Sequence, residues 1–463
     1  MAEVSLAAPV LAPAPPMNPR TRGLLEAPLL PLLLRLAAPN ILVMSAQAST
    51  GLIETYFVSK LGTDALAGMA AVFPGYMLMT MMSSGAMGGG ISSAIARALG
   101  AGRRDDANAF VLHALLINLG FGLFFTLAMR LAGPSLYQIL GLSGRSLTAA
   151  LAYSNVAFGA ATVLWVFNAL ASAIRGTGNM LLPAKVICGG AVVLIPISPC
   201  LIFGLGPFPA LGVAGGGWAL VLYYLIGTLI FATHLARGHG AIRFTWARPA
   251  WLYFRDILRV GLVAMTVTLQ TYVVISFATA LVGRQSPAAV AGFGTGNRLE
   301  YLLVPLIFGL GGPLVAIVGT CLGAGRSDRA MRAVWLGAAV AFAIAETIGI
   351  TAAIWPGAWL RLFGDDPAML AAGASYLRVT GPFYGMYGLG LALYFSAQGA
   401  GRVLWPLVAG LLRLAVVVIG GLIAERLGWG LPGLFVALAA GLCVFGAVNV
   451  AAVLSGSLVR KPA

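Results

Sequence analysis

Charged residues are scarce in this chain of 463 residues. Asp, Glu, Lys and Arg together make up 9% of it, whereas an ordinary soluble domain has roughly 25%. Hydrophobic residues reach 60%. A composition with so little charge excludes a soluble globular domain and is typical of an integral membrane protein. We expect the chain to lie in a bacterial-type cytoplasmic (inner) membrane, surrounded by its lipids.

Cysteine and histidine are also rare, which removes several kinds of site. The four cysteines lie singly in apolar runs without CxxC spacing: Cys188, Cys200, Cys321 and Cys443. This pattern indicates neither a disulfide framework nor a zinc site. The three histidines are scattered and join no carboxylate cluster of the kind an active site needs: His113, His234 and His239. The sequence therefore predicts no enzyme, no metal and no cofactor.

Acidic residues are outnumbered, 13 against 28 basic residues, for a formal net charge of +15. The basic residues form neither a patch nor an aromatic-basic stripe, so nucleic-acid binding is not indicated. They gather instead in alternate turns between apolar runs, among them Arg97, Arg103, Arg104, Arg175, Arg237, Arg326, Arg329 and Arg402. By the positive-inside rule these turns, and both termini, face the cytoplasm.

Long apolar runs fill most of the chain. Residues 1–27 are rich in proline, lack the apolar core of a signal peptide and are predicted to be a disordered cytoplasmic tail. Twelve stretches long enough to cross a bilayer follow. We place them at 29–60, 64–97, 107–133, 145–173, 180–204, 210–236, 251–283, 287–321, 329–357, 367–397, 403–425 and 430–458.

The second half of the chain repeats the first. The motif at 99–103 returns at 322–326, and Gly176-Thr177-Gly178 returns as Gly399-Ala400-Gly401, both at an offset of 223 (322 − 99 and 399 − 176). Each copy has an even number of spans, so both enter the membrane in the same sense, as parallel repeats. We predict an all-α membrane protein with an N-lobe at 28–237, a cytoplasmic linker at 238–250 and a C-lobe at 251–459. That symmetry is typical of transporters.

Polar residues inside the spans mark the candidate sites. Gln47, Thr50 and Glu54 fall at i, i+3 and i+7 and so share one face of the first span. A carboxylate at membrane depth costs at least about 2.5 kcal/mol, and such residues are functional by default. Because burial favours the neutral form of a carboxyl group, Glu54 can load and release a proton. The alternative is that Glu54 only caps or joins neighbouring helices.

A second set could line the space between the lobes and contact substrate. In the eighth span Asn297 and Glu300 are separated by three residues and face the same way, whereas Arg298 points elsewhere. The other members of this substrate set are Tyr153, Asn168, Gln270 and Tyr376, accompanied by Tyr384 and Tyr387. Buried structural pairing is the alternative for Arg298 and Glu300, and the favoured interpretation for Glu346 and Arg413.

Together these stretches resemble the multidrug and toxic compound extrusion (MATE) family from about residue 29 to the end of the last span. The resembling segments are Ile53-Glu54-Thr55-Tyr56-Phe57-Val58, Ala98-Leu99-Gly100-Ala101-Gly102-Arg103, Ile174-Arg175-Gly176-Thr177-Gly178-Asn179, Leu201-Ile202-Phe203-Gly204 and the second-lobe repeats. The resemblance implies twelve helices in two six-helix lobes around a V-shaped cleft. It also implies antiport, in which H⁺ or Na⁺ drives the export of organic, often cationic, compounds.

Glu54 resembles the acidic residue of the family's first span. The family's second acid, before a proline in the fifth span, is Ser198 here, ahead of Pro199. Gln270 stands where one branch of the family has a glutamate, and Arg298-Leu299-Glu300 resembles the DNA-damage-inducible (DinF-like) branch. We therefore expect a cation-coupling site of Glu54, Gln47, Thr50 and Ser198.

One carboxylate favours H⁺ over Na⁺ as the coupling ion, because a hard cation needs several oxygen ligands and gains from a second negative charge. The predicted function is H⁺-coupled export of small organic, often cationic, drug-like compounds or metabolites by a monomer through alternating access. The alternative is a flippase or exporter of lipid-linked or polyanionic cargo. Such a site would need inward-facing cations, for which only Arg298 and Arg413 are available.

Overall fold

The computed structural model describes residues 18–458, which contain helices and no strand. The first half comprises α1 (Pro19–Glu26), α2 (Leu29–Ser59), α3 (Thr63–Met81), the π-helix η1 (Met82–Met87), α4 (Gly88–Gly100), α5 (Arg104–Ile139), α6 (Gly144–Gly159), α7 (Ala161–Gly176), α8 (Leu181–Phe203) and α9 (Val213–Ala236). The second half comprises α10 (Trp251–Gly283), α11 (Pro287–Gly323), α12 (Ser327–Ile354), α13 (Pro356–Leu360), α14 (Pro367–Thr380), the 3₁₀ turn η2 (Gly381–Phe383), α15 (Tyr384–Ala400), α16 (Leu404–Arg426) and α17 (Gly430–Leu454).

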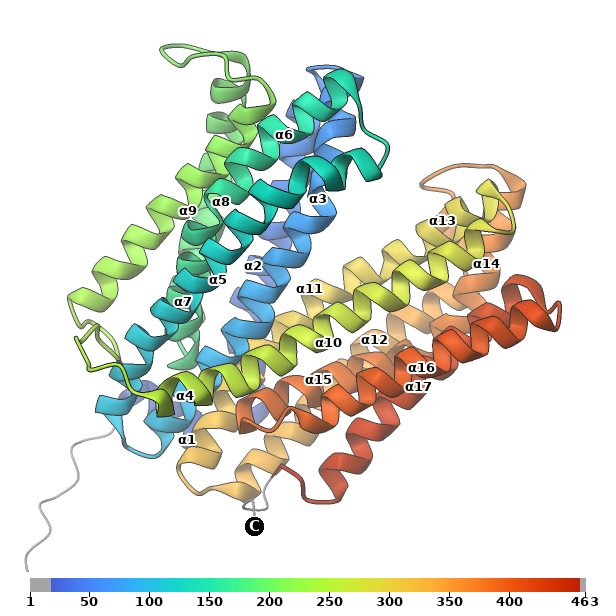
Figure 1. The fold of residues 1–463 in the computed structure, drawn as a ribbon. Coiled ribbons are helices and arrows are strands. Elements are labelled where there is room, and N and C mark those ends of the chain that lie inside the picture. Colours follow the sequence, from blue (N-terminus) through green and yellow to red (C-terminus); the bar gives the residue numbers. More distant parts are fainter. Residues whose placement is uncertain (1–17, 459–463) are drawn as a thin grey trace, which may run out of the picture.

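These helices form two bundles arranged as a V (Figure 1). The N-lobe holds α2 to α9 and the C-lobe holds α10 to α17. The lobes converge where α1 and the C-terminal end of α17 lie, which we call the α1 face, and diverge toward the opposite end, the open face. The predicted all-α, two-lobe architecture is confirmed.

Ten helices, counting α3 to α4 as one, are each long and apolar enough to cross a membrane within residues 18–458. The pair α6 and α7 makes an eleventh span, bent by 43°. The repeat identifies the twelfth: an offset of 223 carries 144–176 onto 367–399 (144 + 223 and 176 + 223), the region of α14, η2 and α15. Both regions were predicted as single spans, 145–173 and 367–397, from the length of their apolar stretches. Pro382 explains one break, because proline donates no backbone hydrogen bond.

Small residues let the lobes approach closely near the α1 face. A Cβ on Gly90 of α4 would lie 2.8 Å from the carbonyl oxygen of Ile257 on α10. A Cβ on Gly319 of α11 would lie 2.9 Å from that of Ala96 on α4. Because backbones meet here without intervening side chains, van der Waals contact is dense at the point where the V closes.

The start of the chain departs from the prediction. Pro19–Glu26, expected within a disordered tail, forms the helix α1. Asn18 caps it by accepting a 3.0 Å hydrogen bond from the backbone N–H of Arg20, and proline is compatible with the first turn. Leu24 and Leu25 are each 3% exposed, so burial of two leucines adds the tertiary contact that a short helix requires. Residues 1–17 lie outside the described residues.

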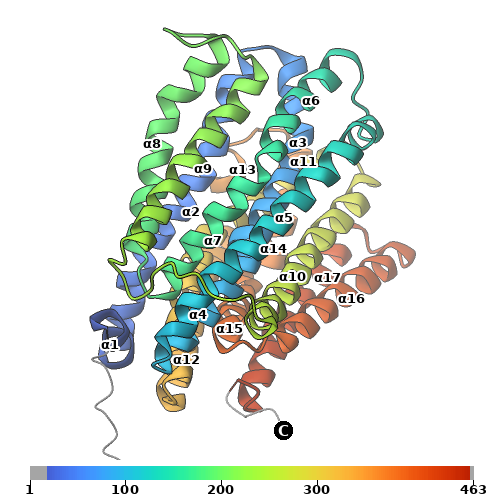
Figure 2. The same cartoon turned by 60° about the vertical axis from the view of Figure 1, so that its left-hand side comes forward.

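The linker between the lobes contains no helix from 237 to 250 and crosses the lower end of the N-lobe to reach α10 (Figure 2). It is tied to α5. The Arg243 N–H donates to Asn108 at 2.8 Å, and the Ala250 N–H lies 3.0 Å from Nε2 of His113. The linker therefore belongs mechanically to the N-lobe, and relative movement of the lobes has to occur where the chain enters α10.

Candidate functional site

Polar contacts between the lobes gather near the α1 face. Asn40 of α2 donates to the Phe308 and Gly309 carbonyls of α11, both at 3.1 Å. Arg97 of α4 forms a 2.9 Å ion pair with Asp256 of α10. Across residues 18–458, the hydrogen bonds and the ion pair that join the lobes all lie in the half nearer this face. These contacts close one end of the molecule.

Glu54, the acid predicted in the first span, lies inside the N-lobe. It is 3% exposed and packs against α9, where a Cβ on Gly216 would lie 2.7 Å from Oε1 of Glu54. The glycine leaves room that a larger side chain would fill. The Tyr153 hydroxyl of α6 lies near the carboxylate. The acid therefore faces protein and is shielded from lipid.

Three tyrosines from three helices lie near this carboxylate. Tyr76 of α3, Tyr153 of α6 and Tyr224 of α9 all lie close enough for its charge to act on their hydroxyls. The Tyr76 hydroxyl donates to that of Tyr224 at 3.1 Å. Oε1 of Glu54 has no hydrogen-bond partner, and none of the three ion pairs in the described part of the chain includes this residue. The site is an acid without an ion-pair partner within residues 18–458, with tyrosine hydroxyl groups nearby.

The other residues predicted for cation coupling lie on two helices. Gln47 and Thr50 are half-buried on the same stripe of α2 as Glu54, and the Thr50 hydroxyl donates to the Gln47 carbonyl at 2.8 Å. Ser198 is buried on α8, which packs against α2, and its hydroxyl has no partner. Tyr76 and Tyr224 were not among the predicted tyrosines. Unlike Tyr153, which recurs as Tyr376, neither has a tyrosine at the offset of 223, where Leu299 and Ala447 stand.

The C-lobe holds a second acid, the half-buried Glu300, in the substrate set. The Tyr376 hydroxyl donates to Glu300 at 2.8 Å and lies 3.3 Å from Oδ1 of Asn297. These three residues and Arg413 line a cavity of about 20 Å³, enough for one water molecule. Tyr376 stands 223 residues after Tyr153 (376 − 153). Each lobe therefore places the same tyrosine against a carboxylate supplied by a different helix.

The remaining lone charges now have neighbours. The Arg413 guanidinium stacks on Tyr387 at 4.9 Å and acts electrostatically on Glu300. Glu346 accepts a 2.7 Å hydrogen bond from the Gly385 N–H, so both residues pair inside the C-lobe. Arg298 is exposed and lies 5.5 Å from the ring of Phe363.

The helical geometry of α11 shows which side of the helix carries Arg298. It lies eleven positions before Gly309 (309 − 298), which is three turns and so the same face of α11. Gly309 meets Ile41 of the N-lobe. Arg298 consequently lies on the face of α11 that is turned toward the other lobe, further toward the open face.

Two predicted substrate residues stand apart from these clusters. Asn168 is buried on α7 and donates to the Ser83 hydroxyl of η1 at 3.2 Å. Gln270 is buried on α10 against Gly410, with neither amide atom hydrogen-bonded. The structure joins neither residue to the trio of Asn297, Glu300 and Tyr376.

Comparison with known proteins agrees with this architecture. The MatE family model matches residues 39–200 and 263–423, well over half of the chain. The chain belongs to the MatE family. It is 27% identical to the FAD transporter of Shewanella oneidensis over 402 residues, covering 86% of this chain and 88% of that one. It is 29% identical to the probable multidrug resistance protein NorM of Deinococcus radiodurans over 436 residues, covering 89% and 92%.

Solved MATE structures share the fold. An outward-facing multidrug resistance MATE transporter of the MOP superfamily matches with a TM-score of 0.86 at 23% identity, over 97% of this chain and all of that one. A MOP superfamily transporter from Pyrococcus furiosus matches with a TM-score of 0.87 at 24% identity, again over 97% of this chain. This MATE protein is therefore an integral membrane transporter. Its assignment near the DinF-like branch stays a prediction.

Proposed function

We propose that this MATE protein is a proton-coupled antiporter that exports small organic, often cationic, compounds by alternating access. The observation that carries the proposal is the environment of Glu54, a buried carboxylate of α2 that packs against α9 and forms no ion pair within residues 18–458. Burying an uncompensated charge costs several kcal/mol. Glu54 is therefore neutralised when enclosed and ionised when water reaches it.

Neutralisation of Glu54 can act on the lobe contacts through α2. The same helix carries Asn40, which bonds to the C-lobe, and Pro39, which removes one helix hydrogen bond next to it. A protonated Glu54 packs against α6 and α9 without a hydration shell. The resulting shift of the outer part of α2 is transmitted past Pro39 to the junction with α11, which links proton loading to the angle between the lobes.

The ligand set favours H⁺ over Na⁺. Beside the one carboxylate, the site offers hydroxyl groups from Tyr76, Tyr153 and Tyr224, and Ser198 replaces the second acid of the resembling family. A sodium site gains from several oxygen ligands and more than one negative charge. A proton needs only Glu54.

The orientation follows from the arginines. The turns at the α1 face carry Arg97, Arg103, Arg104, Arg326 and Arg329, so we assign this face and both termini to the cytoplasm. The open face then lies toward the periplasm of an inner membrane. In the conformation described, Glu54 belongs to the half of the N-lobe nearer that side, where an external proton enters.

The test is transport by purified protein in liposomes under separately imposed pH and sodium gradients. Glu54→Gln keeps the shape but cannot exchange a proton, so we expect it to abolish pH-driven uptake of a cationic dye while the protein stays folded. Glu425→Gln, at an exposed ion pair with Arg284, is the matched control and should transport normally. Normal pH-driven uptake by Glu54→Gln, or uptake driven by sodium alone, would contradict the proposal.

Anionic cargo is the second candidate. One relative is named for FAD, a molecule with two phosphate groups, and Arg298 lies on the lobe-facing side of α11. Arg413 cannot serve in the same way here, because it is buried against Tyr387 and Phe445. A guanidinium can pair with a phosphate through two hydrogen bonds.

Competition experiments separate the two cargo classes. Export of cations predicts that Arg298→Gln leaves dye transport unchanged and that FAD does not compete. Export of an anion predicts that FAD competes with the dye or is itself transported, and that Arg298→Gln weakens this effect by about fivefold or more. The coupling test on Glu54 is independent of this result.

A further inference from the structure

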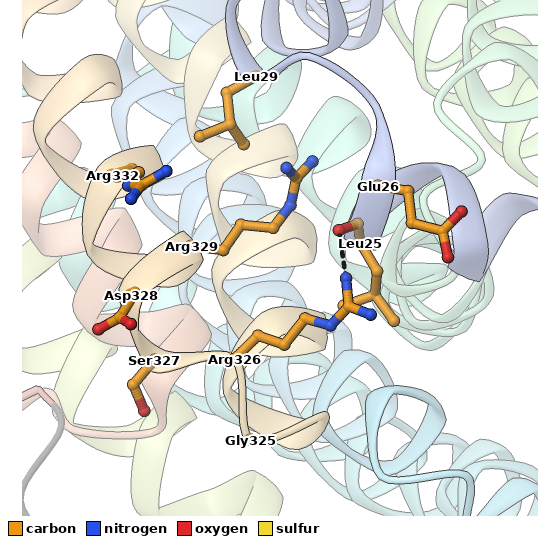
Figure 3. A pocket seen from close by; sticks show the side chains of 9 residues that line it. All are labelled: Leu25, Glu26, Leu29, Gly325, Arg326, Ser327, Asp328, Arg329 and Arg332. Carbon is orange, nitrogen blue, oxygen red and sulfur yellow. Dashed lines mark hydrogen bonds between the residues drawn. The ribbon is translucent and has the colours of Figure 1, made fainter.

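A pocket of about 600 Å³ lies at the α1 face, where α1 meets the turn between α11 and α12 (Figure 3). Three arginines line it, Arg326, Arg329 and Arg332, and Leu25 and Leu29 form its apolar wall. It is far from Glu54 in the helix bundle, and the proposed antiport does not use it. Because like charges repel one another, three arginines around one pocket require a physical explanation.

Two of these arginines hold α1 in place. Arg326 donates from Nη1 to the Leu25 carbonyl at 2.9 Å, and Arg329 donates from Nε to the Leu24 carbonyl at 3.2 Å and from Nη2 to the Ala27 carbonyl. A guanidinium has five N–H donors, so both arginines keep donors for a further partner. Arg332 is exposed and has no hydrogen bond or ion pair within residues 18–458.

Two carboxylates share the pocket wall without neutralising it. Glu26 and Asp328 lie on opposite sides in Figure 3. Neither enters any of the three ion pairs in the described part of the chain. Three arginines against two carboxylates leave a net charge of +1 (3 − 2).

The duplicated turn in the N-lobe provides an internal comparison. At the offset of 223, Arg326 corresponds to Arg103 and Arg329 to Asp106 (326 − 103 and 329 − 106). Arg103 and Asp106 form a 2.8 Å ion pair, three residues apart. In the C-lobe the same two positions hold two cations, Arg326 at the start of α12 and Arg329 in its first turn, and nearby like charges repel one another. An anion bound between them would remove the repulsion.

We propose that this pocket binds the phosphate group of an anionic lipid. It lies where α2 begins its membrane span at Leu29, and the next outward-facing leucines of α2, Leu30 and Leu34, are 44% and 48% exposed. Acyl chains can lie along them while the phosphate contacts the arginines, as in basic pockets at the cytoplasmic membrane surface. A lipid held here touches α12 and the end of α1 together.

Binding of a phosphate group at this pocket also affects how firmly the α1 face is closed. Leu24 of α1 packs on the N-lobe, where a Cβ on Gly178 would lie 2.9 Å from it, while its carbonyl accepts from Arg329 of the C-lobe. The helix thus bridges both lobes. A phosphate that neutralises the arginines keeps them oriented toward α1 and so strengthens this bridge.

The test places the full-length protein in nanodiscs of phosphatidylcholine that contain increasing amounts of phosphatidylglycerol. Lipid binding is measured by thermal unfolding and by native mass spectrometry. We expect phosphatidylglycerol to stabilise the protein. Arg332→Gln should weaken its binding about fivefold, the effect of one arginine near an anionic surface. Arg332 makes no bond to α1, so this variant leaves the helix attached. Arg332→Lys should retain most of the binding, and Arg426→Gln at the open face is the charge control.

Two further arms separate the sources of phosphate. Inorganic phosphate at millimolar concentration should stabilise the protein less than phosphatidylglycerol; equal stabilisation would overturn the lipid assignment. Arg329→Asp rebuilds the neutral pair seen at Arg103 and Asp106, and should abolish preferential phosphatidylglycerol binding. Unchanged lipid binding in both Arg332→Gln and Arg329→Asp would overturn the site itself.

Discussion

The ion pair between Arg97 and Asp256 is the contact through which the balance between conformations can be tested most directly. Nη2 of Arg97 donates to both carboxylate oxygens at 2.9 Å, and its Nη1 lies 3.3 Å from the Gly399 carbonyl of the C-lobe. The Arg97 and Asp256 side chains are 18% and 40% exposed. All of these contacts exist only while the α1 face is closed.

The magnitude follows from this geometry. Asp256→Asn keeps an acceptor oxygen but removes the charge, and a partly exposed pair contributes about 1 kcal/mol. The ratio of closed to open α1 face should fall about fivefold. Arg97→Gln also loses the bond to Gly399, so its cost is about 2 kcal/mol and the ratio should fall about 30-fold.

The assay is the distance between spin labels at the open face, one in each lobe. Ser143 and Asp365 are exposed in the turns before α6 and α14, and the background replaces the four cysteines. Opening of the α1 face brings these labels together, so the short-distance population should grow from wild type to Asp256→Asn to Arg97→Gln. Arg284→Gln breaks a 2.6 Å ion pair within the C-lobe and serves as control. An unchanged distance distribution in Arg97→Gln would refute the reasoning.

Two further predictions concern packing and the second acid. Gly90→Ala places a Cβ 2.8 Å from the Ile257 carbonyl, so we expect a loss of about 1–3 kcal/mol in thermal unfolding. Gly120→Ala, with nothing within 4 Å of its Cβ, should be neutral or slightly stabilising; equal effects of the two would contradict the close-packing argument. Tyr376→Phe removes the 2.8 Å hydrogen bond to Glu300 and should cost about 1–3 kcal/mol in the same assay, whereas an unchanged melting temperature would show that a water replaces the hydroxyl.

Some features of this protein could be predicted because they depend on the chain locally. Hydropathy and length located the spans, and the offset of 223 residues predicted two lobes, since a repeated sequence folds into a repeated bundle. Helical periodicity placed Asn297 and Glu300 on one face, and both contact Tyr376. Periodicity along one helix is a property of that helix alone.

Other features were decided only by the packing of helices against one another. The tyrosines near Glu54 come from α3, α6 and α9, and the arginines that hold α1 come from the start of α12, about 300 residues away in the chain. The bend between α6 and α7, the break at η2 between α14 and α15, and the pairing of Asn168 with Ser83 were likewise not predicted. The rotation and approach of each helix are set by the side chains of several neighbours at once. Sequence therefore determined which residues are polar inside the membrane, and tertiary structure decided which of them meet.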